Sequence, residues 1–506
     1  MGKPNILHNC SGNLGLAVKL CKELFSKFDE IWLIGHKGDL HFPLVEMGVL
    51  DDKDKSIKLA HVQSSLGLEA VNMIIPPKSS FTSMESTISQ LSPRVIDFVK
   101  KVKLKKLKVC VLMPFPNLKF CKIINKLGNN FTITPPARTY KEYLTIENKI
   151  TMSKLIDELA IENPNLRSIV IPWVNINQLG REFSKYKKYF DLTENQGIYF
   201  QKDISAGGSG TKLIKCQADI NRLFKDKLWN RLANQSRIKV SVEILNAYPA
   251  NGSACIIPKE NGTCVVLVDP LSHKPIGPNK SSIGNDWSIP WPRCVQSQYL
   301  LSAKLIGEEL YKKFGYAGIF GPDYIVEMNK NGEFKLKLTE INPRWQGTTP
   351  YQTVNALMAR RIPLELIHYV IKLDENGESI GKLLQLINNP DLYNQISVGS
   401  RGCYYIKLMS PRENKIIQRE INGCYFYRKN TLKGPLSHNY SYLCNSLKST
   451  WVNIKAPRKN EIVGPSITAV GYVWGCSSRA VFSAKTPNFT SYGRKLYQLS
   501  SRMLYE

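Results

Sequence analysis

Residues 339–347, TEINPRWQG, place an acid, an amide and a base at alternate positions directly after an apolar, strand-like run. Glu340 and Arg344 are ionised, and burying an unpaired charge costs several kcal/mol or more. We therefore expect a partner that neutralises these charges. The oxygens of Glu340 and Asn342 are of the kind that hard cations such as Mg²⁺ bind, so a metal ion suits this end of the strand.

The segment before it predicts a β-hairpin, because Asn331-Gly332 is the strongest short signal for a two-residue type I′ turn. With that turn, Asp323 stands opposite Glu340, and the Cβ atoms of opposite residues lie about 4.5–5.5 Å apart. Two-residue periodicity puts Asn342 on the same face. A hard cation would relieve the repulsion between the carboxylates. The alternative is an exposed hairpin with unrelated charges, against which the apolar flanks argue.

This pattern closely resembles the metal-binding end of the ATP-grasp superfamily, in which an acid on one strand precedes E-x-N-x-R after the next. Here the sequence reads GPDYIVE and then EINPR. Other features follow in the family's order. Asn148-Lys149 would stand at the head of a helix, and Lys202 precedes a glycine-rich loop. The strand-like segment VSVEIL gives Glu243, where the family has an acid at its adenine hinge. The resemblance covers residues 140–370.

The resemblance implies a nucleotide site. Lys149 and Lys202 would act as point charges on the phosphates of ATP. The glycine-rich turn would let backbone N–H groups approach the phosphates without a Cβ clash, although GSGTK lacks the ending of a Walker A loop. The hinge from Glu243 to Leu245 would offer backbone groups to adenine. The implied loop residues are Gly207, Gly208, Ser209, Gly210 and Thr211.

The resemblance also implies Mg²⁺, or Mn²⁺, beside ATP. Asp323, Glu340 and Asn342 would hold the ion, which would offset charge at the γ-phosphoryl group. Arg344 would be the catalytic residue that binds a carboxylate or an acyl phosphate with its planar fork. The alternative for Arg344 is a surface arginine stacked on Trp345. For each lysine taken alone, the alternative is a solvated surface position.

Two segments depart from the family pattern. The residues after the hinge, NAYPANGSACI, lack the acid that many members use near the ribose, and Asn251 is the substitute that the sequence offers. Residues 269–293 form a polar stretch rich in Gly, Pro and Ser, which is typical of lids and substrate-binding loops. Four of its side chains could contact substrate, and the sequence does not separate them: His273, Lys274, Lys280 and Arg293.

The elements that must position these residues fall into three parts of an α/β + β protein. In the first 140 residues, strands such as EIWLIG alternate with helices such as LGLAVKLCKELFSKF, which predicts a parallel sheet. The turn at residues 10–15 lacks the G-x-G-x-x-G spacing, so we interpret it as structural. Short strand-like runs predict a mostly β C-terminal domain. The expected domains are residues 1–140 (pre-grasp α/β), 141–373 (ATP-grasp) and 374–506 (β-rich accessory).

Composition narrows the class of protein. The 506 residues are 43% hydrophobic, enough for ordinary cores. We find no leader sequence and no apolar run of 18 residues, so we expect a cytoplasmic protein without a membrane segment. The twelve cysteines include no CxxC pair, as in proteins with reduced core thiols. The net charge of +28 is not accompanied by an RNA-binding aromatic signature, which argues against a nucleic-acid partner.

The sequence therefore predicts an ATP-dependent carboxylate–amine ligase that forms an amide or peptide bond through an acyl phosphate. Its substrates would be amino acids, peptides or intermediates of small-peptide or natural-product biosynthesis. The alternatives are an ATP-grasp enzyme that uses bicarbonate or a thiol, a nucleic-acid-binding protein with a nucleotide fold, and an inactive scaffold. The identity of the substrates, the oligomeric state (a homodimer included) and the role of the C-terminal domain are left open.

Overall fold

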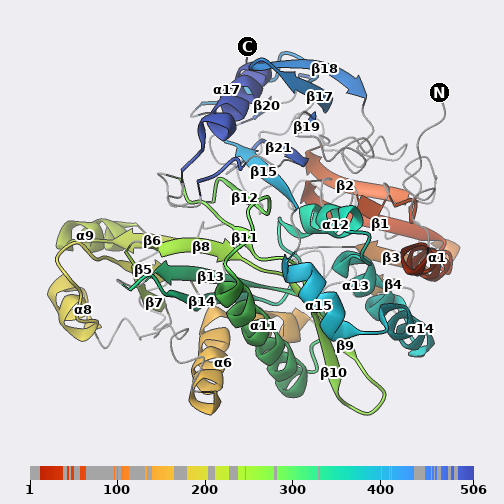
Figure 1. Ribbon diagram of the computed structural model, residues 1–506, viewed down its shortest axis with the longest axis horizontal. Coiled ribbons are helices and arrows are strands. Elements are labelled where there is room, and N and C mark those ends of the chain that lie inside the picture. Colours follow the sequence, from red (N-terminus) through yellow and green to blue (C-terminus); the bar gives the residue numbers. More distant parts are fainter. Residues whose placement is uncertain are drawn as a thin grey trace.

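The computed structural model contains an N-terminal parallel sheet, a small antiparallel sheet and one large sheet surrounded by helices (Figure 1). Within its described residues, none of the helices combines the length and the apolar character that crossing a bilayer requires. The described residues are 12–37, 43–44, 47–50, 57–63, 96, 100, 104–112, 131–133, 140–163, 179–202, 211–226, 238–245, 247–277, 282–328, 331–399, 402–409, 411, 413–437, 451–456, 459–460, 462–463, 469–476, 480–483 and 488–505.

The N-terminal unit is built on parallel strands. Its described elements are α1 (Asn13–Phe25), β1 (Glu30–Lys37), β2 (Ile57–Gln63), β3 (Val109–Leu112) and β4 (Phe131–Ile133). The strands pair in the order β2-β1-β3-β4, and each pair is parallel, which confirms the predicted parallel sheet. Helix α1 packs against α13 (Leu364–Leu373), where Phe25 meets Tyr369 edge-on. The strand expected at residues 5–10 lies outside the described residues.

A small unit follows the helices α5 (Tyr140–Glu147) and α6 (Lys149–Glu162). It consists of α8 (Phe183–Tyr189), β5 (Ile198–Gln201), β6 (Thr211–Ile214), α9 (Gln217–Lys225) and β7 (Lys239–Val242). The strands form an antiparallel sheet in the order β6-β5-β7. Tyr186, Phe200 and Val240 are buried in a core of its own. The unit projects from one end of the molecule (Figure 1).

The large sheet carries the hairpin that the sequence singled out. Its strands are β8 (Ala247–Asn251), β9 (Ala254–Pro258), β10 (Cys264–Val268), β11 (Ser272–His273), β12 (Gly284–Asp286), β13 (Gly318–Met328), β14 (Phe334–Asn342), β15 (Cys403–Leu408), β17 (Gly423–Arg428), β18 (Thr431–Ser437), β19 (Trp451–Lys455) and β21 (Gly471–Cys476). Their order is β10-β9-β13-β8-β11-β12-β15-β21-β19-β17-β18, with β14 paired to β13. A separate pair joins β16 (Lys415–Ile416) to β20 (Ile462–Val463).

Helices cover this sheet and bury its apolar side chains. The remaining described helices are α11 (Arg293–Phe314), α12 (Thr349–Met358), α14 (Glu378–Ile387), α15 (Pro390–Gly399) and α17 (Ser491–Tyr505). Helix α11 ends at Gly315, whose left-handed φ of 58° suits a residue without a Cβ. Its residues Ile306 and Leu310 pack with Phe320 and Val326 of β13 in one core. The hairpin is therefore packed against α11.

Residues 269–293 differ from the expected lid or substrate loop. They contain β11 and β12, which join β8 to the C-terminal strands in one sheet. Asp286 is fully buried and accepts hydrogen bonds from the backbone N–H groups of Val481 and Phe482, at 3.0 and 3.3 Å. The loop interpretation is therefore wrong for these strands, because their polar side chains satisfy buried backbone groups.

The C-terminal segment is more mixed than its sequence suggested. It opens with the helices α14 and α15, and it ends with α17. The strands between them extend the large sheet through the pairing of β12 with β15. Among the described residues, the segment therefore shares a sheet with the preceding part of the chain. The boundaries at residues 140/141 and 373/374 stay predictions.

The hairpin of β13 and β14 places Asp323 opposite Glu340, as predicted. Its turn differs from the prediction. Met328 pairs with Phe334, one residue out of the register that a two-residue turn would set. A β-bulge directly after Asp323 shifts the register back by one residue. The predicted pair thus forms because two one-residue shifts cancel.

Glu365, in the first turn of α13, is a buried carboxyl group whose pKa affects stability. Thr353 Oγ1 donates to its Oε2 at 2.6 Å, while its Oε1 finds no hydrogen-bond partner among the described residues. Burial raises the pKa of Glu365 from 4.5 to about 8. Between these values the folded protein holds a proton that the unfolded chain has lost. The contribution of this group to stability therefore falls as the pH rises through that window, by about 1.4 kcal/mol per pH unit.

We expect Glu365→Gln to remove this loss, because glutamine is neutral at every pH. The variant should match the wild type in melting temperature near pH 4.5 and exceed it at pH 8. Thermal unfolding across this pH range tests the prediction. Glu378→Gln, at an exposed position in the first turn of α14, is the matched control and should follow the wild-type profile. Parallel profiles for Glu365→Gln and the wild type would contradict it.

Candidate functional site

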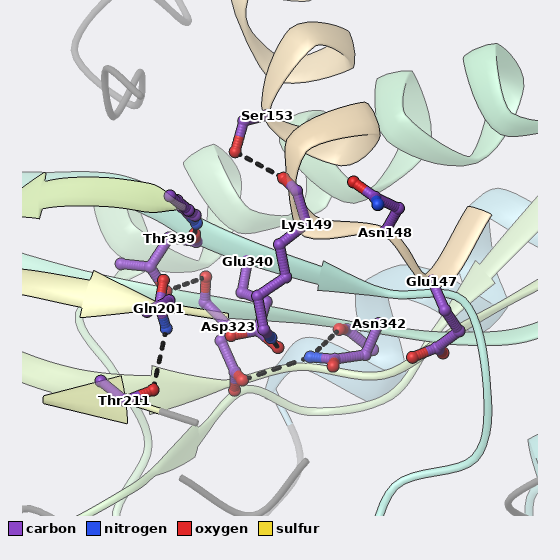
Figure 2. A network of polar contacts seen from close by, with 12 residues as sticks. Glu147, Asn148, Lys149, Ser153, Gln201, Thr211, Asp323, Thr339, Glu340 and Asn342 are labelled. Atoms are coloured by element: carbon purple, nitrogen blue, oxygen red, sulfur yellow. Dashed lines mark hydrogen bonds and ion pairs between the residues drawn. The ribbon is translucent and has the colours of Figure 1, made fainter. Parts of the chain in front are cut away.

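The open end of the β13–β14 hairpin brings the predicted metal ligands together (Figure 2). Asn342 is buried, and its Nδ2 donates to Asp323 Oδ2 and to Gly321 O, each at 3.3 Å. The register pairs Asp323 with Glu340 and Gly321 with Asn342, which puts all three side chains at one edge of the hairpin. The structure thus gathers these residues, while their role as metal ligands stays a prediction.

Two lysines neutralise the paired carboxylates. Lys149 Nζ makes an ion pair with Glu340 Oε1, and Lys274 Nζ lies 2.7 Å from Asp323 Oδ1. Lys149 is the first residue of α6, where the Asn148 side chain caps the helix by accepting from two backbone N–H groups. This cap fixes the direction in which Lys149 leaves the helix. The repulsion expected between Asp323 and Glu340 is therefore relieved by internal ammonium groups in this structure.

A third lysine, Lys239, reaches the same place from the small unit. It is 2% exposed, and its Nζ donates to the carbonyl oxygen of Thr339, next to Glu340. Burial lowers the pKa of Lys239 to about 8, although the charge of Glu340 acts in the opposite direction. Lys239 was not predicted from the sequence. The signal was a lysine at the start of the short strand KVSV, whose other residues carry no charge.

The ammonium groups also set the charge of Glu340. Burial alone would raise the pKa of this carboxyl group. The charges of Lys149 and Lys239 outweigh burial and hold the pKa of Glu340 below its usual value. Glu340 is therefore ionised at neutral pH, which is the state that a cation would bind.

Arg344, the expected catalytic residue, is 6% exposed and engaged with protein groups. Its Nε lies 2.9 Å from Glu147 Oε1, and one terminal nitrogen donates to Asn342 Oδ1 at 3.0 Å. The other donates to Trp345 O at 3.1 Å. Glu147 is the last residue of α5 and is itself buried. The guanidinium fork thus links α5 to the hairpin end and orients the Asn342 carboxamide.

Asn251 and Gln346 complete the polar cluster. Asn251 Nδ2 donates to Asp323 Oδ1 at 2.7 Å and to Gln346 Oε1 at 2.9 Å, while no residue in the described part of the chain donates to its Oδ1. Gln346 Nε2 donates to Gly321 O at 3.1 Å. A Cβ on Gly321 would come within 2.0 Å of the Gln346 amide carbon, so any other residue there would displace the Gln346 carboxamide. Asn251 therefore supports Asp323 directly, a contact that the ribose interpretation did not include.

On the nucleotide side, the structure describes the two ends of the predicted loop. Lys202 directly follows β5, and Thr211 begins β6 and accepts from Gln201 Nε2 at 3.3 Å. Gly207, Gly208, Ser209 and Gly210 lie outside the described residues. The binding of phosphate by these residues stays a prediction.

Glu243, in the predicted adenine hinge, makes several contacts within the small unit. Its backbone N–H donates to Gly197 O at 2.8 Å, and its backbone C=O accepts from Gln196 Nε2 at 3.2 Å. Its carboxylate accepts from Gly197 N and pairs with Lys215, each at 3.1 Å. Glu243 thus holds the small unit together. Leu245 is 39% exposed, and the binding of adenine at this hinge stays a prediction.

Of the four candidate substrate residues in 269–293, only Lys274 is seen to reach the cluster. His273 is buried and stacked on Trp291, with ring centroids 3.8 Å apart, and burial lowers the pKa of His273 to about 4. Arg293 is exposed at the start of α11. Lys280 lies outside the described residues. Lys274 directly follows β11 and donates its backbone N–H to Pro249 O of β8 at 2.9 Å. Successive residues of extended backbone point to opposite faces, so Lys274 and not His273 faces Asp323.

The donor set at the hairpin end fits Mg²⁺, which uses one or two carboxylates and completes its shell with water and phosphate. The described residues hold no group of three or more His, Cys, Asp or Glu side chains, so an ion here would depend on Asp323 and Glu340. Asn342 turns its Oδ1 toward Arg344 and its Nδ2 toward Asp323. The amide oxygen of Asn342 has two lone pairs, so it could bind an ion while still accepting from Arg344.

Comparison with solved structures relates this arrangement to a known fold. The biotin carboxylase domain of Hydrogenobacter thermophilus 2-oxoglutarate carboxylase, solved with MgADP, ADP and bicarbonate, aligns with a TM-score of 0.55 and 10% identity. The alignment covers 89% of this chain and 86% of that chain. Campylobacter jejuni biotin carboxylase, solved as a β-γ-ATP complex, gives a TM-score of 0.54, 13% identity, and coverage of 89% and 88%.

Rhizobium etli pyruvate carboxylase aligns with a TM-score of 0.52 and 13% identity over 89% of this chain and 36% of its own. The biotin carboxylases are ATP-grasp enzymes, so the chain has the ATP-grasp fold that its motifs predicted. The sequence matches no protein-family model, and no curated protein is significantly similar to it.

Proposed function

We propose that this protein is an ATP-dependent carboxylate–amine ligase. The proposal is carried by the hairpin end, where the oxygens of Asp323, Glu340 and Asn342 lie beside the ammonium groups of Lys149 and Lys274. Such a cluster combines ligands for a divalent cation with charges for phosphate and carboxylate oxygens. The nucleotides bound in the two biotin carboxylases support it.

In the proposed reaction, a substrate carboxylate oxygen attacks the γ-phosphorus of ATP. The bond from that phosphorus to the bridging oxygen breaks, and ADP leaves. The amine then attacks the acyl carbon of the acyl phosphate, the C–O bond breaks, and phosphate leaves while the amine proton passes to solvent. Activation is needed because phosphate is a better leaving group than a carboxylate oxygen. The products are an amide, ADP and phosphate.

Each residue of the cluster would have its own role in this reaction. Asp323, Glu340 and Asn342 would hold Mg²⁺ or Mn²⁺, which supplies positive charge at the transferring phosphoryl group when bound. With a divalent cation on the carboxylates, the ammonium groups of Lys149 and Lys274 would be available to phosphate and substrate oxygens. Arg344 would keep Asn342 in place through its fork.

We further propose small-molecule partners, namely an amino acid or peptide carboxylate and an amine, in small-peptide or natural-product biosynthesis in the cytoplasm. A second candidate is an ATP-grasp enzyme that phosphorylates bicarbonate. The bicarbonate anion in the Hydrogenobacter thermophilus structure favours it. Bicarbonate would take the place of the substrate carboxylate at the same cluster.

The deciding experiment measures ADP release from MgATP with pairs of amino acids, each with and without bicarbonate. Release that needs two amino acids, with an amide product identified by mass spectrometry, supports the ligase. Release that needs bicarbonate and gives no amide supports the second candidate. If calorimetry shows that MgADP does not bind, both are wrong.

Lys202→Ala is expected to weaken binding of MgADP by about tenfold or more. Removal of one charge-assisted hydrogen bond costs about 1.5–3 kcal/mol, and 1.4 kcal/mol corresponds to a factor of ten. Calorimetry on the purified protein measures the effect. Lys225→Ala, at an exposed position in α9 of the same unit, is the matched control. Unchanged affinity in Lys202→Ala would remove Lys202 from the nucleotide site.

A further inference from the structure

Lys239 stands apart from the other lysines of the cluster because it comes from the small unit. Its strand, β7, pairs with β5, and Lys239 lies opposite Gln201. The donor bond from its Nζ to Thr339 O crosses to β14 of the large sheet. Lys239 therefore links the two sheets beside Glu340, at the end of β5 where Lys202 and the glycine-rich segment begin.

The contacts of Lys239 leave its charge poorly satisfied. An ammonium group has three donors, and the described residues provide Lys239 with one acceptor, the Thr339 carbonyl. The side chain is nevertheless almost completely buried. Asp157, on α6, attracts Lys239 without an ion-pair contact, whereas Lys149 repels it. A buried cation with two unused donors is costly unless a further anion meets it.

The charge balance at the hairpin end indicates which kind of anion would meet Lys239. Among the described residues, the ammonium groups of Lys149, Lys239 and Lys274 are matched by Asp323, Glu340 and, at longer range, Asp157. Arg344 does not change this balance, because Glu147 pairs with it. A divalent cation on Asp323 and Glu340 would leave a positive excess. A polyphosphate carries the several negative charges that such an excess requires.

We propose that Lys239 is a third phosphate-binding cation of the nucleotide site, which contacts the polyphosphate of ATP from the small unit in addition to Lys149 and Lys202. The inference rests on the proposed function. The alternative is that Lys239 serves only as a structural link between β7 and β14. The two interpretations predict different ligand affinities for a variant that removes the charge of Lys239 and keeps the apolar length of its side chain.

The test compares the full-length wild type with Lys239→Met in calorimetry with ADP, inorganic tripolyphosphate and adenosine, each with Mg²⁺. We expect ADP and tripolyphosphate to bind about tenfold or more weakly to the variant, with adenosine unchanged. Lys225→Met is the matched control. Equal affinities for ADP in wild type and Lys239→Met would overturn the inference and leave the proposed function standing. No ADP binding by the folded wild type would overturn both.

Lys239→Gln is a second variant for the case that Lys239→Met does not fold. Its amide can still donate toward Thr339 O but carries no charge. If Lys239→Met does not fold, a folded Lys239→Gln with weakened ADP and tripolyphosphate binding supports the inference. Wild-type affinity in Lys239→Gln overturns it, because a neutral donor would then be sufficient. Thermal unfolding of each ligand-free variant establishes that it is folded.

Discussion

Glu340→Gln is expected to reduce magnesium-dependent ATP turnover by at least about 10²-fold, roughly 2.7 kcal/mol of barrier, and also to destabilise the ligand-free protein. Turnover falls because a neutral amide offers a divalent cation one weak oxygen in place of a carboxylate. Glu340 is the central anion of the cluster, since its charge acts on both Lys149 and Lys239. No other acid among the described residues can take its position on β14.

The loss of stability follows from the ion pair with Lys149. Like charges at Asp323 and Glu340 alone would make the substitution stabilising, but each carboxylate has an ammonium partner. Lys149 is 6% exposed, and removing one partner of a buried pair costs about 3–5 kcal/mol. The double variant Lys149→Met/Glu340→Gln should therefore melt at a higher temperature than Glu340→Gln, without regaining turnover.

Thermal unfolding without ligands and ADP release with MgATP measure the two effects. Glu327→Gln is the matched control, because Glu327 lies on the partner strand β13 in a half-exposed pair with Lys337 at 2.7 Å. Exposed pairs of this kind contribute about 0–1 kcal/mol. Normal turnover in Glu340→Gln would show that the hairpin does not bind the metal. A higher melting temperature would show that repulsion at Asp323 outweighs the Lys149 pair.

The hairpin end was predictable because its rules are local. Strand alternation puts Glu340 and Asn342 on one face whatever the rest of the fold does. The turn prediction was off by one residue, and the bulge after Asp323 compensated for it. A bulge depends on how β13 also pairs with β8 and β9, so no local signal contains it.

The partners of the cluster were not predictable, because they come from distant parts of the chain. Lys149 and Glu340 are 191 positions apart, and Lys239 and Thr339 are 100 apart. Lys274 was one of four equal candidates, and only the position of the residue that follows β11 shows that its side chain reaches Asp323. From the sequence alone a lysine is expected at the surface, and only tertiary packing shows that it is buried. The same holds for Glu147, whose burial only tertiary packing shows.

Arg344→Lys and Asn342→Ala are each expected to lower turnover by about 10²-fold or more, and the double variant is expected to be no worse than the single ones. The reason is that the Arg344 fork holds the Asn342 carboxamide, with 3.0 Å between the donor nitrogen and Oδ1. A lysine ammonium cannot reproduce the planar set of bonds to Glu147, Asn342 and the Trp345 carbonyl. Arg344→Lys should also melt at a lower temperature, since Glu147 is buried.

Residues that act as one unit show losses that do not add, whereas independent residues show additive free energies. The measurement is ADP release for the wild type, the two single variants and the double variant, with titration of Mn²⁺ into each ligand-free protein. If Arg344 works through Asn342, both single variants bind Mn²⁺ more weakly and the double variant adds little. If the losses in turnover add while Arg344→Lys binds Mn²⁺ normally, Arg344 acts on the substrate itself. That outcome would require the buried pair with Glu147 to open during the reaction.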